Sequence, residues 1–292
     1  SKQQIVDALS QAWLDGSSLR TYRHAPNAGP RKSWAAGDAT SRAVRLADLT
    51  LKGEIGYPSV LTAPTWGFYD VSFQGKNFEL SQNYNSYVME NILFKISFPA
   101  EFHSQTAAEA AVRLHPVVKD RLTDIKEIKI KTHESAIRII SKVGPLNNPA
   151  DRDHCLQYMI AVPLVFGNLT AEHYEDDFHH NNPIIDTLRE KMTVKEEPRY
   201  TSEYLEPDKR SIANSLQILY NDGSMTEEVE INYPVGHRRR REEGIPLLEE
   251  KFKTNLLTFF TKDRCEEIFN LCKDQEKLEN TKVNDFMDLF IP

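Results

Sequence analysis

The chain has 292 residues, of which 40% are hydrophobic and 27% charged, and its formal net charge at pH 7 is −7. These values are typical of a soluble globular protein with one large domain or two ordinary ones. The acidic balance argues against a nucleic-acid binder, which normally carries a basic excess. No apolar run reaches the roughly 20 residues of a membrane span. Three cysteines without zinc-type spacing favour a reducing compartment.

The N-terminal part of the chain is expected to be helical. Ile5, Leu9 and Trp13 recur at helical spacing, which predicts an amphipathic helix that Asp15 and Gly16 close. A loop rich in Pro, Gly and cations follows, and a second helix is expected from Trp34 to Leu51. The cations of the loop are Arg20, Arg23, His24, Arg31 and Lys32. Cations before a helix of small residues can hold a carboxylate or phosphate. They can equally pair with neighbouring acids in a solvated loop, and the sequence leaves both readings open.

A turn in the middle of the chain combines a lysine, a histidine and the start of a helix. An apolar run that contains Lys95 stops at Pro99, because proline fixes its φ and lacks an N–H. Ser104 then stands at the N-cap position of an alanine-rich helix over residues 105–113. Lys95 and His103 therefore flank a turn that leads to a helix N-terminus, where an anion is favoured. The alternative is a buried lysine stem beside a surface histidine.

The pattern then becomes mixed. Ile125, Ile128 and Ile130 stand among charged residues in a pattern close to alternation, which predicts a half-buried strand. Asn148 or Asp151 is expected to cap a helix through residues 155–161, whose first turn would carry Arg152 and His154. A short helix is expected at residues 187–192. Two β-rich segments flank Asn221-Asp222-Gly223, which predicts a hairpin, and the C-terminal portion returns to helical spacing.

A metal site is not expected. His179 and His180 are adjacent, but no third ligand stands at a fixed spacing, and a set made with His133 and His173 has no recognisable pattern either. The arginine run from Arg238 to Arg241 is followed at once by Glu242 and Glu243. It therefore predicts a paired turn rather than a nucleic-acid surface.

Several long segments carry a resemblance to a known family. They are RTYRHAPNAGPRKSWAAGDATSRAVRLA, GYPSVLTAPTWGFYDVSFQG, VMENILFKISFPAEFHSQTAAEAA, KTHESAIRII, GPLNNPADRDHCLQYM and YPVGHRRRREEGIP. Together they closely resemble the MmgE/PrpD family of dehydratases, which also includes cis-aconitate decarboxylase. The resemblance runs over essentially the whole chain.

The resemblance implies a mixed α and α+β fold with two domains. Residues 1–91 would be the C-terminal part of a large helical domain, and residues 92–234 a smaller α+β lid domain with an antiparallel sheet. Residues 235–292 would be helices that return to the helical domain. The family also implies a homodimer formed through the helical domain, and it occurs in the mitochondrial matrix and in bacterial cytoplasm.

The activity implied is elimination of water from the tricarboxylate 2-methylcitrate to give 2-methyl-cis-aconitate, in propionate catabolism, without a metal or another cofactor. The resemblance matches the catalytic positions to Lys32, Lys95, His103 and Tyr158. The expected substrate-binding residues are Arg23, His24, Arg31, Arg152 and His237. Such a substrate needs several fixed cations, a base for the proton and an acid for the departing hydroxyl.

One motif of the family is absent from this sequence. The family normally has a preceding helical portion with a motif of the type HxxDFxD, and none occurs among the 292 residues. The chain is therefore expected to correspond to the C-terminal portion of the enzyme. Two alternatives follow: a catalytically incomplete binding or assembly module, or a related citrate or aconitate hydro-lyase or decarboxylase.

Overall fold

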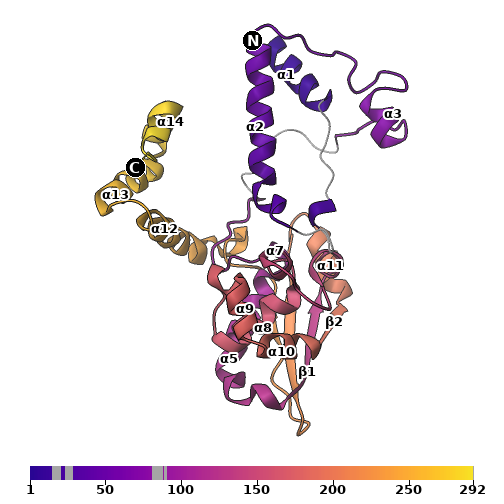
Figure 1. The fold of residues 1–292 in the computed structure, drawn as a ribbon, viewed down its shortest axis with the longest axis vertical. Helices are drawn as coiled ribbons and strands as arrows, with labels where there is room; N and C mark the ends of the chain where they lie inside the picture. The colour runs from indigo at the N-terminus through magenta and orange to yellow at the C-terminus, as the bar shows by residue number, and fades with distance from the viewer. Residues whose placement is uncertain (15–20, 24–28, 81–87, 89–90, 292) are drawn as a thin grey trace. The chain divides into compact units, whose positions relative to one another are not determined.

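The computed structural model describes residues 1–14, 21–23, 29–80, 88 and 91–291, and the chain divides into two compact units (Figure 1). The first unit consists of Ser1–Asn85 and Leu146–Arg152. The second consists of Ser86–Pro145 and Asp153–Pro292. No helix within the described ranges is long and apolar enough to cross a membrane.

The first unit is helical. Its elements are α1 (Lys2–Leu14), η1 (Thr21–Arg23), α2 (Arg31–Leu51), α3 (Phe68–Phe73) and α7 (Pro149–Arg152). The two expected N-terminal helices are confirmed as α1 and α2, while Asp15 and Gly16 lie outside the described residues. A polar contact joins α1 to α2, because Gln11 Nε2 donates to Thr50 Oγ1 at 3.2 Å.

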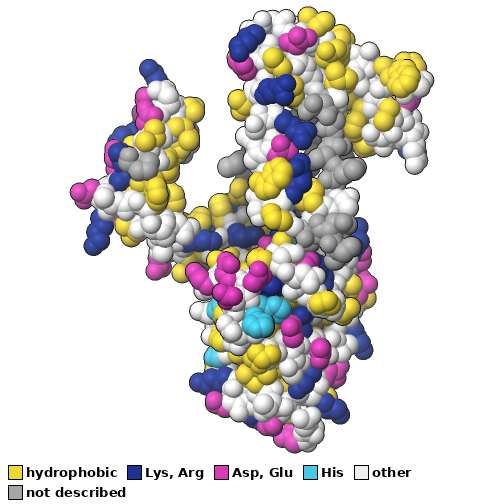
Figure 2. Space-filling model, in the orientation of Figure 1, with side chains coloured by type: hydrophobic (Ala, Val, Ile, Leu, Met, Phe, Trp, Pro, Cys, Tyr) yellow, Lys and Arg dark blue, Asp and Glu magenta, His cyan; other side chains and the backbone are white. Residues whose placement is uncertain are grey.

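The apolar side chains of α1 are exposed in this unit. Ile5 and Leu9 are 62% and 58% exposed, whereas the polar Ser10 and Gln11 are buried. Trp13 touches the ring of Phe68, with 4.4 Å between centroids. Figure 2 shows hydrophobic side chains at the surface of these helices. The spacing thus predicts the helix correctly, but among the described residues the apolar face has little cover.

The second unit contains a four-stranded sheet. Its strands are β1 (Ile125–Thr132), β2 (Met192–Glu196), β3 (Asn214–Tyr220) and β4 (Val229–Ile231), in the order β2-β1-β3-β4. The strand expected around Ile128 is confirmed as β1, and the expected hairpin joins β3 to β4. Its connection includes the Asn221-Asp222-Gly223 turn, where the Tyr220 N–H donates to Ser224.

The expected antiparallel pairing holds for β1 with β3 and for β3 with β4, but the sheet as a whole is mixed, because β2 pairs with β1 in parallel. Parallel neighbours need a long crossover connection, and here the chain between Thr132 and Met192 supplies several helices. The short helix expected at 187–192 is α10 (Ile184–Glu190), and Met192 already belongs to the strand. The five residues MTVKE give too short a pattern to predict a strand from the sequence.

This unit also contains helices that pack on the sheet and on one another. They are η2 (Phe102–Ser104), α5 (Gln105–Val118), η3 (Lys119–Asp124), α6 (Glu134–Ile140), α8 (Leu156–Phe166), η4 (Ala171–Tyr174), α9 (Asp176–Asn181), α10 and α11 (Pro198–Leu205). The alanine-rich helix expected after Ser104 is confirmed as α5, whose Ala107, Ala108 and Ala111 are fully buried. Small side chains let it lie close to its neighbours α8 and β3. The Ser104 hydroxyl donates to the Glu101 carbonyl and makes no side-chain cap.

The single helix expected to start at Asn148 or Asp151 is in fact two helices. Asn148 Oδ1 accepts from the Asp151 N–H at 3.0 Å and so caps α7, which ends at Arg152. Cys155 then has an extended backbone, with φ −119° and ψ 108°, and α8 begins after it. Cys155 therefore interrupts the helical pattern that the sequence suggested.

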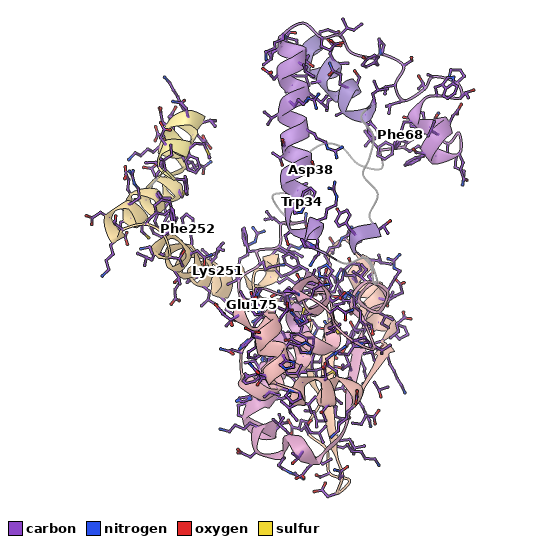
Figure 3. All side chains as sticks on the ribbon, viewed as in Figure 1. Trp34, Asp38, Phe68, Glu175, Lys251 and Phe252 are labelled. Atoms are coloured by element: carbon purple, nitrogen blue, oxygen red, sulfur yellow. The ribbon has the colours of Figure 1, made fainter. Side chains whose placement is uncertain are left out.

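The C-terminal residues form η5 (Arg238–Arg240), α12 (Arg241–Leu257), α13 (Lys262–Lys273), α14 (Gln275–Asn280) and α15 (Val283–Asp288). The expected return to helix is confirmed. Leu256, Cys265 and Ile268 form a small core, against which Phe252 of α12 packs. Figure 3 labels Phe252 next to Lys251 on α12.

Candidate functional site

A carboxylate and a histidine form the centre of the candidate site. After the Pro99 turn, the Glu101 carboxylate caps η2 by accepting from the His103 N–H at 2.7 Å. Both carboxylate oxygens also lie 2.8 Å from His103 Nδ1. Because an ionised carboxylate only accepts hydrogen bonds, Nδ1 carries the hydrogen. In a neutral His103 ring, Nε2 therefore carries a lone pair and can accept a hydrogen bond or a proton.

The other side of the His103 ring faces a pocket. Nε2 lies 3.3 Å from the Tyr204 hydroxyl, which comes from α11. The pocket has a volume of about 480 Å3. Its lining residues all belong to the second unit: Val88, Asn91, Ile92, Leu93, Phe102, His103, Tyr204, Arg210, Ile212, His237 and Arg238. Nε2 is thus placed where it can exchange a proton with a bound molecule.

The electrostatics keep Glu101 ionised. Burial alone would raise the pKa of this carboxyl, but its hydrogen bonds with His103 and the nearby histidine charges hold the pKa below its usual value. An ionised, buried carboxylate stabilises an imidazolium on His103. The pair therefore has the arrangement of a general base with its orienting carboxylate.

A second histidine supports the first. His133 follows β1, is fully buried, and stacks on Tyr204 with 4.5 Å between ring centroids. Its ring lies 5.1 Å from that of His103. Burial, followed by the charge of His103, lowers the pKa of His133 to about 4. His133 is therefore neutral at physiological pH, and its ring packs against the rings of His103 and Tyr204.

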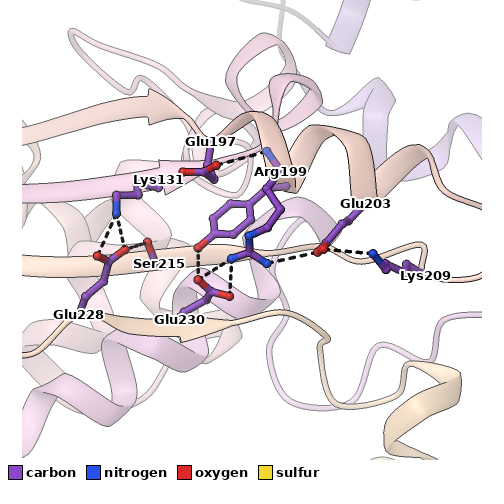
Figure 4. Close-up of polar contacts among 9 residues, drawn as sticks. Lys131, Glu197, Arg199, Glu203, Lys209, Ser215, Glu228 and Glu230 are labelled. Carbon is purple, nitrogen blue, oxygen red and sulfur yellow. Dashed lines mark hydrogen bonds and ion pairs between the residues drawn. The ribbon is translucent and has the colours of Figure 1, made fainter.

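Tyr204 is positioned by a polar network around α11 (Figure 4). Arg199 donates to both oxygens of Glu230 on β4, at 2.7 and 2.8 Å, and the Tyr200 hydroxyl donates to the same carboxylate at 2.7 Å. Tyr200 and Tyr204 are four residues apart, so they lie on the same face of the helix. The network ties the helix that carries Tyr204 to the edge of the sheet.

His237 forms part of the pocket wall and is buried. Its Nδ1 accepts from the Arg239 N–H at 3.2 Å. Burial, helped by the adjacent charges of Arg238 and Arg239, lowers the pKa of His237 to about 4. His103 and His237 are thus the two predicted site residues that line one pocket.

Lys95 and Tyr158 also belong to the second unit but do not line the pocket. Lys95 is exposed, and its Nζ lies 4.9 Å from the ring centroid of Phe102, which does line it. The Tyr158 hydroxyl donates to the His173 carbonyl at 2.5 Å, and the side chain is fully buried. The roles that the resemblance gives these two residues stay predictions.

The remaining predicted residues belong to the first unit. Arg31 pairs with Asp38 at 3.0 Å and lies 4.3 Å from the Trp34 ring, all on α2, where Figure 3 labels Trp34 and Asp38. Lys32 is half-buried at the start of the same helix. Arg152 is buried at the end of α7. The backbone of Arg23 ends η1, and His24 lies outside the described residues.

The sequence did not identify Glu101, His133, Tyr204 or Arg210 as residues of this site. Glu101 had a local signal, because a carboxylate two residues before a histidine on a Pro turn can cap and orient it. The other three come from segments far along the chain and carry no such pattern. Within the described ranges, no group of three His, Cys, Asp or Glu residues is arranged to hold a metal ion.

The fold and the pocket define a helix-rich protein with a small mixed sheet and a carboxylate-oriented histidine. Residues 1–81 match the MmgE/PrpD N-terminal domain, and residues 98–275 match the MmgE/PrpD C-terminal domain. The chain belongs to the MmgE/PrpD family.

Several curated relatives are identical to the chain at more than half of the aligned positions. The chain is 56% identical to "2-methylcitrate dehydratase" of Escherichia coli K12 over 100% of its length and 61% of the relative's. It is 57% identical to the protein of that name from Cupriavidus necator, over 99% of the chain and 60% of the relative. It is 55% identical to "2-methylcitrate dehydratase, mitochondrial" of Yarrowia lipolytica, over 100% and 56%. The chain thus spans about six tenths of the length of these relatives.

Proposed function

We propose that the chain carries the hydro-lyase chemistry of a 2-methylcitrate dehydratase, eliminating water from 2-methylcitrate to give 2-methyl-cis-aconitate. The main support is the Glu101–His103 pair at the pocket wall, with a tyrosine hydroxyl within 3.3 Å of Nε2. Identity of 55–57% to curated proteins of that name supports the choice of reaction.

The proposed reaction has one base and one acid. His103 Nε2 takes the proton from the carbon next to a carboxylate, and the electron pair left behind forms the double bond. The bond between the neighbouring carbon and the hydroxyl breaks as Tyr204 donates its proton, so the hydroxyl leaves as water. Tyr204 then recovers a proton from His103 across the 3.3 Å contact, and both groups return to their starting states.

Several residues would assist this chemistry. Ionised Glu101 stabilises the imidazolium that forms on His103, and neutral His133 places no second charge behind it. Lys32, Lys95 and the other cations that the resemblance matches would bind carboxylates of the substrate. In this proposal the protein works in propionate catabolism, in the mitochondrial matrix or bacterial cytoplasm, as a homodimer formed through the helical domain and with residues 92–234 as the lid.

The experiment is a dehydration assay in the presence of EDTA. 2-Methylcitrate is mixed with the chain, and formation of the conjugated alkene is followed by ultraviolet absorbance. We expect absorbance to rise, and His103→Ala to abolish the rise. The same assay is run on the chain extended to the length of its relatives. A rise with the extended chain alone would mean that essential catalytic groups lie outside the 292 residues. No rise from either protein would contradict the proposed function.

A further inference from the structure

We infer that Arg210, whose backbone is held in a strained conformation, is a carboxylate-binding residue of the His103 pocket. The inference rests on the proposed function for the identity of the ligand, a tricarboxylate. Arg210 follows α11 in the chain and lines the same pocket as His103 and Tyr204.

The backbone of Arg210 is unusual. Its φ is +47°, in the left-handed region that residues with a Cβ rarely adopt. A glycine or asparagine would fit this position with less strain. Residues in such sparsely populated conformations persist only where the surrounding structure fixes them, and they are concentrated at functional sites. Because glycine would suit the backbone better, we look for the role of this residue in its side chain.

Surrounding hydrogen bonds hold the strained turn. The Arg210 N–H donates to the Glu206 carbonyl at 2.9 Å, and the Ser211 N–H donates to the Glu203 carbonyl at 3.3 Å. These hydrogen bonds join backbone atoms of the turn, and the Arg210 side chain takes no part in them. They fix the conformation without requiring an arginine.

Arg238, which also lines the pocket, has a structural role. Arg238 donates to the carbonyls of Pro207 and Asp208 and to Asn91 Oδ1, so its guanidinium holds the turn. Arg210 is exposed, and its guanidinium has no hydrogen-bond or ion-pair partner among the described residues. Of the two arginines that line the pocket, Arg210 is therefore the one available to a ligand.

The chemistry of the pocket selects the ligand class. A guanidinium binds a carboxylate through two parallel hydrogen bonds. A base that removes a proton next to a carboxylate needs that carboxylate fixed, because the reacting carbon must stay within reach of Nε2. The guanidinium of Arg238 is bound to backbone carbonyls, so the cation on this side of the pocket that can bind such a carboxylate is Arg210.

The test measures binding without turnover. Tricarballylate is a tricarboxylate that lacks the hydroxyl, so it cannot be dehydrated. Its affinity is measured by isothermal titration calorimetry for the wild-type chain, Arg210→Gln, Arg210→Lys and Arg210→Gly. Arg264→Gln, which removes a cation from an exposed ion pair on α13, is the control for net charge.

We expect Arg210→Gln and Arg210→Gly to weaken binding by about tenfold to a hundredfold, the usual effect of losing hydrogen bonds to a charged group. Arg210→Lys should fall between them and the wild type, and Arg264→Gln should bind as the wild type does. Arg210→Gly should also raise the melting temperature, because glycine relieves the strain. A structural role would predict the opposite change in melting temperature.

Unchanged affinity in Arg210→Gln would overturn the inference, as would a wild-type chain that does not bind tricarballylate. A lower melting temperature for Arg210→Gly would also contradict it. The proposed function fails in a different way. If binding depends on Arg210 but 2-methylcitrate gives no alkene even with the extended chain, the dehydratase proposal is wrong and the carboxylate site stands.

Discussion

Glu101 and His103 are two residues apart in the chain, and the carboxylate of one holds both the backbone N–H and the Nδ1 of the other. This double contact fixes the orientation of the ring as well as its tautomer. Glu101→Gln keeps the size and an acceptor oxygen but removes the charge that stabilises the imidazolium. We expect kcat for 2-methylcitrate to fall roughly a hundredfold or more, measured as the initial rate of alkene formation.

Glu109→Gln is the control for this substitution. Glu109 is also a partly buried glutamate in an ion pair, with Arg240, and it does not line the pocket. Its loss should lower stability without a comparable loss of kcat. Equal rates for Glu101→Gln and the wild type would show that His103 does not need its carboxylate and would remove the basis for assigning it as the base.

The sequence predicted those parts of the site that depend on local patterns. The Pro99 turn, the helix after Ser104 and the strand around Ile128 are each set by residues close in the chain, through proline geometry, helix propensity and alternation. His103 was found because it stands in such a local pattern.

The partners of His103 could not be predicted in this way. Tyr204 lies 101 residues further along the chain, and only the packing of α11 against the sheet brings it to the histidine. The sequence gives His133 no feature beyond its position between a strand and a helix. Its stacking on Tyr204 depends on the same packing. The parallel position of β2 was missed for a related reason, since pairing over a long crossover leaves no signal in five residues.

The burial of His133 predicts a specific pH dependence of stability. Its pKa falls from 6.5 in the unfolded chain to about 4 in the folded one, so the unfolded state binds more protons between these values. The contribution of this neutral ring to the free energy of unfolding is therefore fully present above pH 6.5, and it is lost as pH falls towards 4. For this one group we expect a loss of about 2 kcal/mol between pH 7 and pH 5.

His133→Phe removes the titrating group and also two buried ring nitrogens that have no hydrogen-bond partner. Urea unfolding at pH 7 and pH 5, followed by far-UV circular dichroism, gives the loss for each protein. The loss should be about 2 kcal/mol smaller in the variant. His237 has a similar pKa shift in the same direction, so some pH dependence will remain. An identical pH dependence in both proteins would mean that His133 is not buried as a neutral ring.

The network around α11 predicts that a residue outside the pocket affects catalysis. Glu230→Gln weakens the contacts that Arg199 and Tyr200 make with β4 (Figure 4). The cost in stability should be about 1 kcal/mol, as for a partly exposed charged hydrogen bond. We expect kcat to fall severalfold, because the helix that carries Tyr204 loses its anchor to the sheet, while KM changes little.

Glu228→Gln is a matched control on the same face of the sheet. Glu228 accepts from Lys131 and Ser215, and its side chain is 34% exposed, against 35% for Glu230. These partners belong to β1 and β3, whereas those of Glu230 belong to α11. The two variants should lose similar stability, with kcat reduced only in Glu230→Gln. Equal kcat values would show that the anchor has no effect on Tyr204.

Two glycines predict opposite effects of the same substitution. Gly236 has a φ of +101°, and a Cβ there would lie 2.1 Å from the Phe94 carbonyl oxygen. Gly236→Ala therefore forces the backbone before His237 to move, and we expect a loss of about 3 kcal/mol or more. Gly37 lies inside α2, with nothing within 4 Å of an added Cβ, so Gly37→Ala should stabilise the helix by about 0.5–1 kcal/mol.

The two effects can be measured separately. Trp13, Trp34 and Trp66 are the only tryptophans of the chain, and all three belong to the first unit. Tryptophan fluorescence therefore follows unfolding of that unit, where Gly37→Ala should raise the urea midpoint. Far-UV circular dichroism also detects the second unit, where Gly236→Ala should lower it. A tolerated Gly236→Ala would mean that the backbone between Pro234 and His237 can adopt another path, and the wall of the pocket would then not be fixed by this glycine.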